Sequence, residues 1–173
     1  MEDILKNIKV DAEGLRIRAG RPEDLDEIMQ IATLACDENG FLNPNPQKLA
    51  AEIYPALCFN YGIVGLIGKP NDKIEGVVLL RIGTMWYADD YVVEEKAIFI
   101  HPDFRNAKGG RGRKLCEFSK RVADTLGIPL IIGVLSNSRT EAKVRMYERQ
   151  FGKPSGAFFL YGAKTGKENR REH

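Results

Sequence analysis

The chain has 173 residues, of which 43% are hydrophobic and 29% are charged, and its formal net charge at pH 7 is +2. These values are typical of an ordinary soluble globular protein, large enough to bury a core in one domain. They exclude a low-complexity chain, and the net charge is too small to indicate nucleic-acid binding by itself.

The few cysteines and histidines argue against a metal centre. Three cysteines (Cys36, Cys58 and Cys116) lie far apart, with no histidine near any of them. This spacing favours free thiols over a disulfide framework, and His101 and His173 are too few for a histidine-rich metal site. Since no apolar run reaches membrane-spanning length and no signal-peptide pattern opens the chain, we expect no metal, no membrane contact and a cytoplasmic protein.

Periodicity in the first half of the chain predicts a strand, two helices and a β-hairpin. Residues 1–14 carry no pattern and are expected to form an N-terminal extension to a single domain over residues 15–163. Apolar residues at helical spacing, with proline and acidic residues in the first turn, predict the first helix. In order, the predicted elements are a strand at 15–18, helices at 21–36 and 47–54, the second ending before Pro55, and strands at 63–67 and 74–82.

The second half predicts three strands alternating with two helices. In order, these are a strand at 91–100, a helix up to Leu126, a buried strand at 130–135, a helix opened by a capping box at Ser138, and a last strand at 157–161. Residues 164–173 are expected to form a disordered basic tail. The order β-α-α-β-β-β-α-β-α-β predicts an α/β (α+β) fold, a mixed, mostly antiparallel twisted sheet flanked by about four helices.

A glycine-rich turn inside residues 97–126 joins a strand to a helix. Free backbone N–H groups and the partial positive charge of a helix start suit an anion. The spacing fits neither a P-loop nor a dinucleotide fingerprint, so a phosphate site and a solvated loop are equally supported by the residues alone. Five cationic side chains lie in or beside the turn: Arg105, Lys108, Arg111, Arg113 and Lys114.

The block from Ile98 to Phe151 resembles the GNAT superfamily of acyl-CoA-dependent N-acyltransferases. Residues 100–102 match the family's turn after its central strand, Arg105 its cation, and Gly110-x-Gly112 its glycine pair. Residues 17–25 and 74–78 resemble the family's first strand and helix and its hairpin, so the likeness covers residues 15–162. There is a looser likeness to GNAT proteins encoded by prophages.

The resemblance implies acetyl-CoA as co-substrate. Two departures qualify it, since four residues separate Arg105 from Gly110 where the family has two, and the last helix ends Phe-Gly in place of Gly-Phe. The residues expected to contact the cofactor are Ile98, Phe99 and Ile100 on the strand, Arg105, Lys108, Gly109, Gly110, Arg111, Gly112 and Arg113 in the turn, and Asn137 after the buried strand.

The same resemblance suggests which residues move protons. A lysine-like amine has a pKa near ~10.4 and attacks a thioester only after losing a proton. Strand alternation puts Glu94 on one face with Ile98 and Ile100, and Glu95 on the other, so we favour Glu94 as the base with Glu95 close behind. Tyr147 is the candidate acid for the leaving thiolate. The competing interpretations are a solvated carboxylate for either glutamate and a core aromatic for Tyr147.

The leading hypothesis is therefore an N-acetyltransferase that moves an acetyl group from acetyl-CoA to a primary amine by direct transfer in a ternary complex. No cysteine stands where an acyl-enzyme needs its nucleophile. The acceptor is a small-molecule amine or a protein or peptide amine, and a homodimer fits the family. The alternative is a catalytically weak or inactive GNAT-fold protein with a binding, regulatory or assembly role. A nucleic-acid binder ranks last, because no aromatic residues interleave the basic ones.

Overall fold

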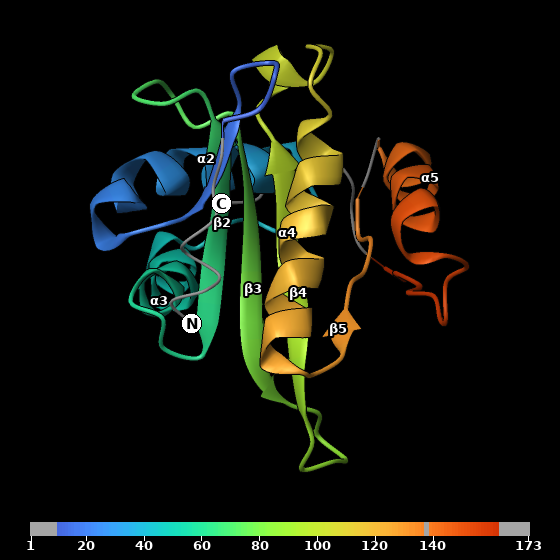
Figure 1. Cartoon of the computed structure of the whole chain (residues 1–173). Helices are drawn as coiled ribbons and strands as arrows, with labels where there is room; N and C mark the ends of the chain where they lie inside the picture. The colour runs from blue at the N-terminus through green and yellow to red at the C-terminus, as the bar shows by residue number, and fades with distance from the viewer. Residues whose placement is uncertain (1–9, 137–138, 163–173) are drawn as a thin grey trace.

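The computed structural model describes residues 10–136 and 139–162, which form a five-stranded sheet with helices on both faces (Figure 1). Strands lie side by side in sequence order, antiparallel from β1 to β4, with β5 parallel to β4. The strands are β1 (Arg16–Ala19), β2 (Gly62–Gly68), β3 (Gly76–Thr84), β4 (Tyr91–Ile100) and β5 (Leu130–Ile131). The mixed, mostly antiparallel sheet expected from the sequence is confirmed.

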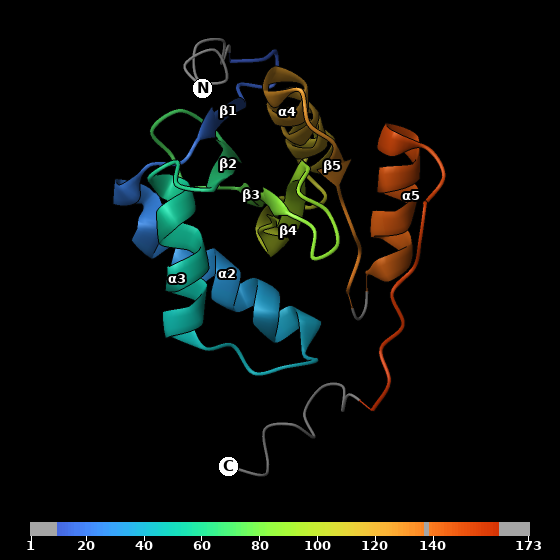
Figure 2. The same cartoon turned by 90° about the horizontal axis from the view of Figure 1, so that it is seen from below.

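The helices divide between the two faces of the sheet. In the view from below, α2 and α3 lie on one side, α4 lies on the other, and α5 stands beside β5 (Figure 2). The helices are α2 (Leu25–Asn39), α3 (Pro46–Leu57), α4 (Arg111–Leu126) and α5 (Thr140–Phe151), with short 3-10 turns η1 (Pro22–Asp24) and η2 (Pro102–Phe104). None of these helices is long and apolar enough to cross a membrane.

Strand β2 explains why the sheet needs helices on both faces. Ile63 and Ile67 pack in the core under α4, whereas Val64 and Leu66 pack in a second core under α2 and α3. All four side chains are at most 2% exposed. A strand buried on both faces reads as a continuous apolar run, as this one does in the sequence.

Three predicted elements differ from the structure. Helix α3 runs to Leu57 and includes Pro55, because a proline in the last turn loses only one intrahelical hydrogen bond. The strand expected at 130–135 is only two residues long, and Ile131, on the edge strand, is 37% exposed. The strand expected at 157–161 is wrong, since this segment pairs with no other strand in the part of the chain that the structure describes and its large apolar side chains are exposed. Local β-propensity does not supply the partner that a strand requires.

Some expectations lie outside the described residues. These are the disordered tail at 164–173, most of the N-terminal extension, the capping residue Ser138 and the cofactor contact Asn137. The end of the extension is described, and it is tied to the domain because Lys114 of α4 binds the carboxylate of Asp11.

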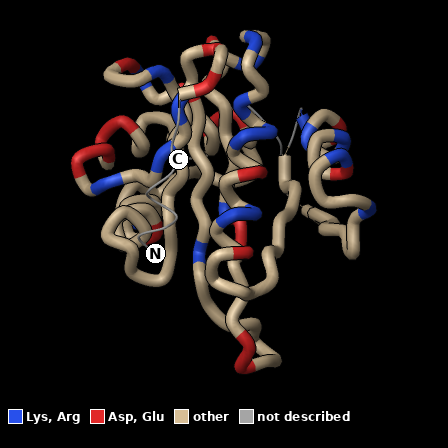
Figure 3. The backbone as a smooth tube through the Cα atoms, viewed as in Figure 1, with Lys and Arg blue, Asp and Glu red and all other residues tan. Residues whose placement is uncertain are grey.

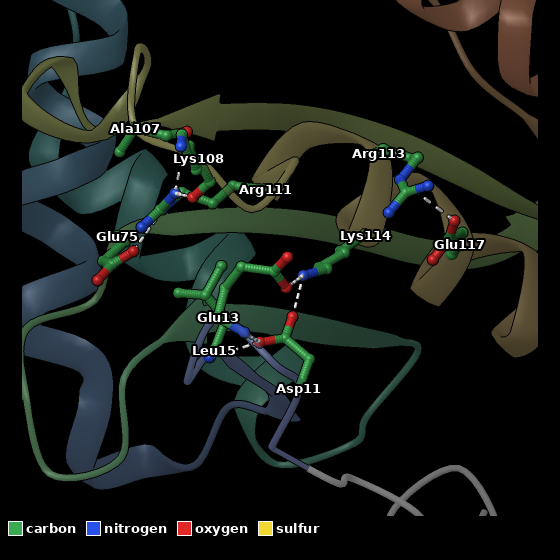
Figure 4. Close-up of polar contacts among 10 residues, drawn as sticks. All are labelled: Asp11, Glu13, Leu15, Glu75, Ala107, Lys108, Arg111, Arg113, Lys114 and Glu117. Carbon is green, nitrogen blue, oxygen red and sulfur yellow. Dashed lines mark hydrogen bonds and ion pairs between the residues drawn. The ribbon is translucent and has the colours of Figure 1, made fainter.

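A buried ion pair joins the start of α4 to the start of β3. The Arg111 guanidinium donates from Nε to Glu75, and their side chains are only 6% and 2% exposed (Figure 4). Arg111 also donates from Nη1 to the carbonyl of Lys108, 2.8 Å away. A charge removed from water needs such partners, and the pair therefore anchors the turn to the sheet.

Removal of either partner should be costly, because the other charge then stays buried without compensation. We expect Glu75→Ala and Arg111→Ala each to lower the free energy of unfolding by about 3–5 kcal/mol in urea titrations at pH 7. The matched control is Arg145→Ala, which breaks an exposed pair with Glu141 (61% and 90% exposed) and should change stability by less than about 0.5 kcal/mol. Losses at Glu75 and Arg111 no larger than in the control would contradict an anchoring role.

Candidate functional site

Strand β4 contains one residue more than the stretch of β3 with which it pairs. Leu79 of β3 pairs with Ala97, and the next residue, Leu80, pairs with Glu95, which leaves Lys96 without a partner in β3. This is a β-bulge, and a bulge shifts the alternation of side chains by one residue beyond it.

The bulge decides which glutamate faces which side of the sheet. Glu95 lies on the face of Ile98 and Ile100, toward α4 and α5, whereas Glu94 lies on the face of Phe99, toward α2 and α3. The prediction that Glu94 shares a face with Ile98 and Ile100 is therefore wrong. It assumed unbroken alternation, and the bulge inserts one residue between the glutamates and the isoleucines.

Beyond the bulge, β4 and β5 separate. Their pairing consists of Val93 with Leu130 and Glu94 with Ile131, and stops there. A cavity of about 400 Å³ lies between β4 and the chain that continues from β5, with the end of α2 and helix α5 completing its wall. The Gly133 N–H donates across this gap to Oε2 of Glu95, at 3.4 Å.

Glu95 lines this cavity and contacts Tyr147, which is not among the residues that line it. The Tyr147 hydroxyl donates to Oε2 of Glu95 at 3.4 Å, and Tyr147 itself is 8% exposed. Burial raises the pKa of Glu95 to about 7, although the Gly133 N–H, the ammonium of Lys143 and the Tyr147 hydroxyl all act to lower it. Burial, followed by the charge of Glu95, raises the pKa of Tyr147 as well. The result is a carboxyl that titrates near neutrality beside a hydroxyl that keeps its proton.

The glycine turn ends at a helix start that no side chain caps. Gly109 and Gly110 have left-handed φ values of 117° and 59°, and Gly110 is the N-cap of α4. A Cβ on Gly109 would lie 2.6 Å from Cδ1 of Leu15, so a larger residue there would require the Leu15 side chain to move and would strain the backbone at its positive φ. Since Gly110 has no capping side chain, the first N–H groups of α4 are available to another acceptor.

Comparison with known proteins identifies the fold. No protein-family model and no curated protein matches the sequence, but solved structures match nearly the whole chain. An aminoglycoside acetyltransferase from an uncultured soil metagenomic sample, in complex with trehalose, is 16% identical over 88% of this chain and 99% of that one (TM-score 0.64). AAC(6')-Iy, in complex with a bisubstrate analogue, CoA-S-monomethyl-acetylneamine, is 14% identical over 87% and 98% (TM-score 0.64). An integron cassette protein from the mobile metagenome of Cole Harbour Salt Marsh is 20% identical over 87% and 91% (TM-score 0.62).

The chain has a GNAT-like fold, the fold of these solved structures. At these identities the likeness concerns the fold, and the roles of individual residues depend on their geometry in this chain. The sequence resemblance predicted cofactor contacts at the end of β4 and in the turn before α4. The cavity lies beside this part of β4.

Arg105 is engaged elsewhere in this GNAT fold. Its Nε donates to the carbonyl of Ile100 at 2.9 Å, and its guanidinium forms an ion pair with Glu38 of α2. The same guanidinium lies 5.0 Å from the centroid of the Phe99 ring. Arg105 therefore ties the turn to α2 and to β4, and its side chain is not directed at the uncapped start of α4.

The other cationic residues of the turn are of two kinds, those held in ion pairs within the protein and those exposed to solvent. Basic residues recur along α4 and in the loop before it (Figure 3). Arg111 is buried against Glu75, and Lys114 is bound to Asp11 (Figure 4). Lys108 is exposed, and Arg113 is exposed with a 3.7 Å contact to Glu117 one turn along the helix. The side chains of Arg105 and Arg111 are thus held in ion pairs within the protein, whereas those of Lys108 and Arg113 are exposed.

Of the remaining predicted residues, Ile98, Phe99 and Glu94 line the cavity, whereas Ile100 and Gly112 do not. Ile98 and Phe99 bury their side chains in the two cores. Gly112 lies against α5, where a Cβ would lie 2.6 Å from the sulfur of Met146. Glu94 is 45% exposed and forms a 2.8 Å ion pair with Lys96.

The environment of Glu95 predicts a pH dependence of stability. Because its pKa is raised from 4.5 to about 7, the folded protein holds this proton more tightly than the unfolded chain. The contribution of Glu95 to the free energy of unfolding therefore falls as the pH rises from about 4.5 to about 7. We expect Glu95→Gln, which has no charge to bury, to gain roughly 2–3 kcal/mol over the parent protein between pH 4.5 and pH 8 in urea unfolding. The control Glu94→Gln should show no such gain, and a parallel pH profile for parent and Glu95→Gln would contradict the raised pKa.

Proposed function

We propose that this protein is an N-acetyltransferase that moves an acetyl group from acetyl-CoA to a primary amine by direct transfer in a ternary complex. The observation that supports this most is that Glu95, which lines the cavity where β4 and β5 separate, accepts a hydrogen bond from the Tyr147 hydroxyl. The fold is shared with acetyltransferases and therefore favours this reaction, although a fold by itself does not assign one.

The residues present fit a CoA-type co-substrate at two places. Among the described residues, no strand pairs with the side of β4 that faces away from β3 after Glu94. The backbone groups there can therefore pair with the amides of an extended arm lying in the cavity. At the far end of β4, the uncapped start of α4 offers N–H groups to a pyrophosphate, with Lys108 and Arg113 as nearby cations. When bound, the co-substrate supplies an acyl thioester.

Glu95 and Tyr147 have the properties that the two proton transfers require. At neutral pH a carboxyl with a pKa of about 7 is partly ionised and can accept a proton from an incoming ammonium, directly or through water. Tyr147 keeps its proton until negative charge develops on the departing sulfur, and can then donate it. We therefore propose Glu95, in preference to Glu94, as the base and Tyr147 as the acid.

The cysteines support direct transfer. Cys116 is fully buried near Glu95, and burial raises the pKa of its thiol to about 12. Cys36 lines the cavity, but burial and the charge of Asp37 raise its pKa as well. Since the thiolate is the nucleophilic form, neither cysteine is suited to carry the acyl group.

We further infer that the acceptor amine is attached to an apolar group. A second cavity of about 400 Å³ lies between α2, α3 and the sheet, and meets the first along β4. Its wall is aliphatic except for Cys36, Phe99, Glu52 and Lys96. A polycationic aminoglycoside, the substrate class named for several neighbours, needs more carboxylates than this wall provides. The two cavities share Ala35, Cys36, Lys96, Ala97 and Phe99.

Turnover of the variants tests the proposal. With acetyl-CoA and a panel of apolar primary amines, Glu95→Gln and Tyr147→Phe should each lower kcat by about 10²–10⁴, while acetyl-CoA affinity measured by calorimetry changes little. Glu94→Gln is the control and should retain its rate. Full turnover in both variants would exclude this pair from the mechanism.

The pH profile gives an independent check. Because the base must be ionised, kcat/KM for the parent protein should rise with pH and level off above about 7, the pKa of Glu95. Acetyl-CoA binding without acetylation of any amine would instead favour the binding or regulatory protein considered from the sequence.

A further inference from the structure

Lys143 brings an amine of the chain itself to the cavity. It lies on α5 four residues before Tyr147, and residues at this spacing share one face of a helix. Lys143 lines the same cavity as Glu95, but it comes from α5 whereas Glu95 comes from β4. A primary amine thus lines the cavity in which the acyl thioester is proposed to bind.

This amine is not held by a partner. Among the described residues, no ion pair within 4.0 Å and no hydrogen bond involves the Lys143 ammonium, and its nitrogen is not sealed from solvent. Other lysines differ, since Lys114 binds Asp11 and Lys120 donates to the carbonyl of Gln150. A half-buried ammonium without such a partner has lost hydration that no ion pair replaces.

The surroundings favour its neutral form. Burial lowers the pKa of Lys143, and Arg105 from the glycine turn and Arg139 from the start of α5 lower it further. Glu95 of β4 and Glu38 of α2 act in the opposite direction. More of this amine is therefore unprotonated, and able to attack a carbonyl, than of an exposed lysine at the same pH.

We propose that Lys143 is an internal acyl acceptor, modified by the thioester bound in the cavity. In the reaction, Lys143 Nζ bonds to the carbonyl carbon, the carbon–sulfur bond breaks, and the proton lost from nitrogen ends on the departing sulfur. No oxidation or reduction occurs, and the products are Nε-acyl-lysine and the free thiol. The proposal rests on the proposed function, because it takes its acyl donor from the same site.

Peptide mapping by mass spectrometry after incubation with acetyl-CoA at pH 8 tests it. We expect Lys143 to be acetylated at least about tenfold faster than the exposed Lys48 and Lys153, because a bound donor raises the local concentration of thioester. Lys143→Arg should lose this label and keep the slow background at the other lysines. Equal rates at the three lysines would overturn the proposal.

A second readout needs no co-substrate. Under trace labelling with acetic anhydride, the pH of half-maximal labelling should be lower for Lys143 than for Lys48, and an equal or higher value would count against an activated amine. Calorimetric titration with acetyl-CoA separates the two proposals. Binding without faster labelling of Lys143 overturns only the internal acceptor, whereas absence of binding overturns the cofactor assignment as well.

Discussion

The bulge at Lys96 is the constraint on which the site depends. A sheet strand presents alternate side chains to its two faces, so one inserted residue exchanges the faces of everything that follows. Here the bulge turns Glu95 toward α4 and α5, where Tyr147 lies. On the other side of the bulge, Ile98 of the same strand packs into the core on that same face. The separation of β4 from β5 at the same level leaves room for a ligand beside that carboxyl.

The glycine turn divides its charges between structure and solvent. Arg111 and Arg105 reach back to Glu75 and Glu38, and hold the turn against β3 and α2. Such pairs make the turn rigid, although removing their charges from water costs free energy. Recognition of an anion is then left to backbone N–H groups and to the exposed side chains. A basic turn in the sequence is therefore not equivalent to a basic surface in the fold.

Several parts of the architecture could be predicted because they depend on local patterns. Helical spacing and stop signals located α2, which ends at the left-handed Gly40, and α4, which ends at Gly127. The hairpin pattern predicted strands at 63–67 and 74–82, which correspond to β2 and β3. The errors occur where a distant partner decides the outcome, as for residues 157–161, whose strand-like composition is paired with no strand among the residues that the structure describes. The helix that continues through Pro55 shows that a local stop signal can also be overridden.

The sequence by itself determined the class of fold, the position of the glycine turn and the short list that contains Glu94, Glu95 and Tyr147, because periodicity and turn chemistry are local properties. Only the tertiary structure decided which glutamate meets Tyr147, since that depends on pairing between β3 and β4 and on the residue inserted between them. It also brought Lys143 to the cavity. A side chain's pKa and partners follow from what other segments pack around it, and no local pattern records that packing.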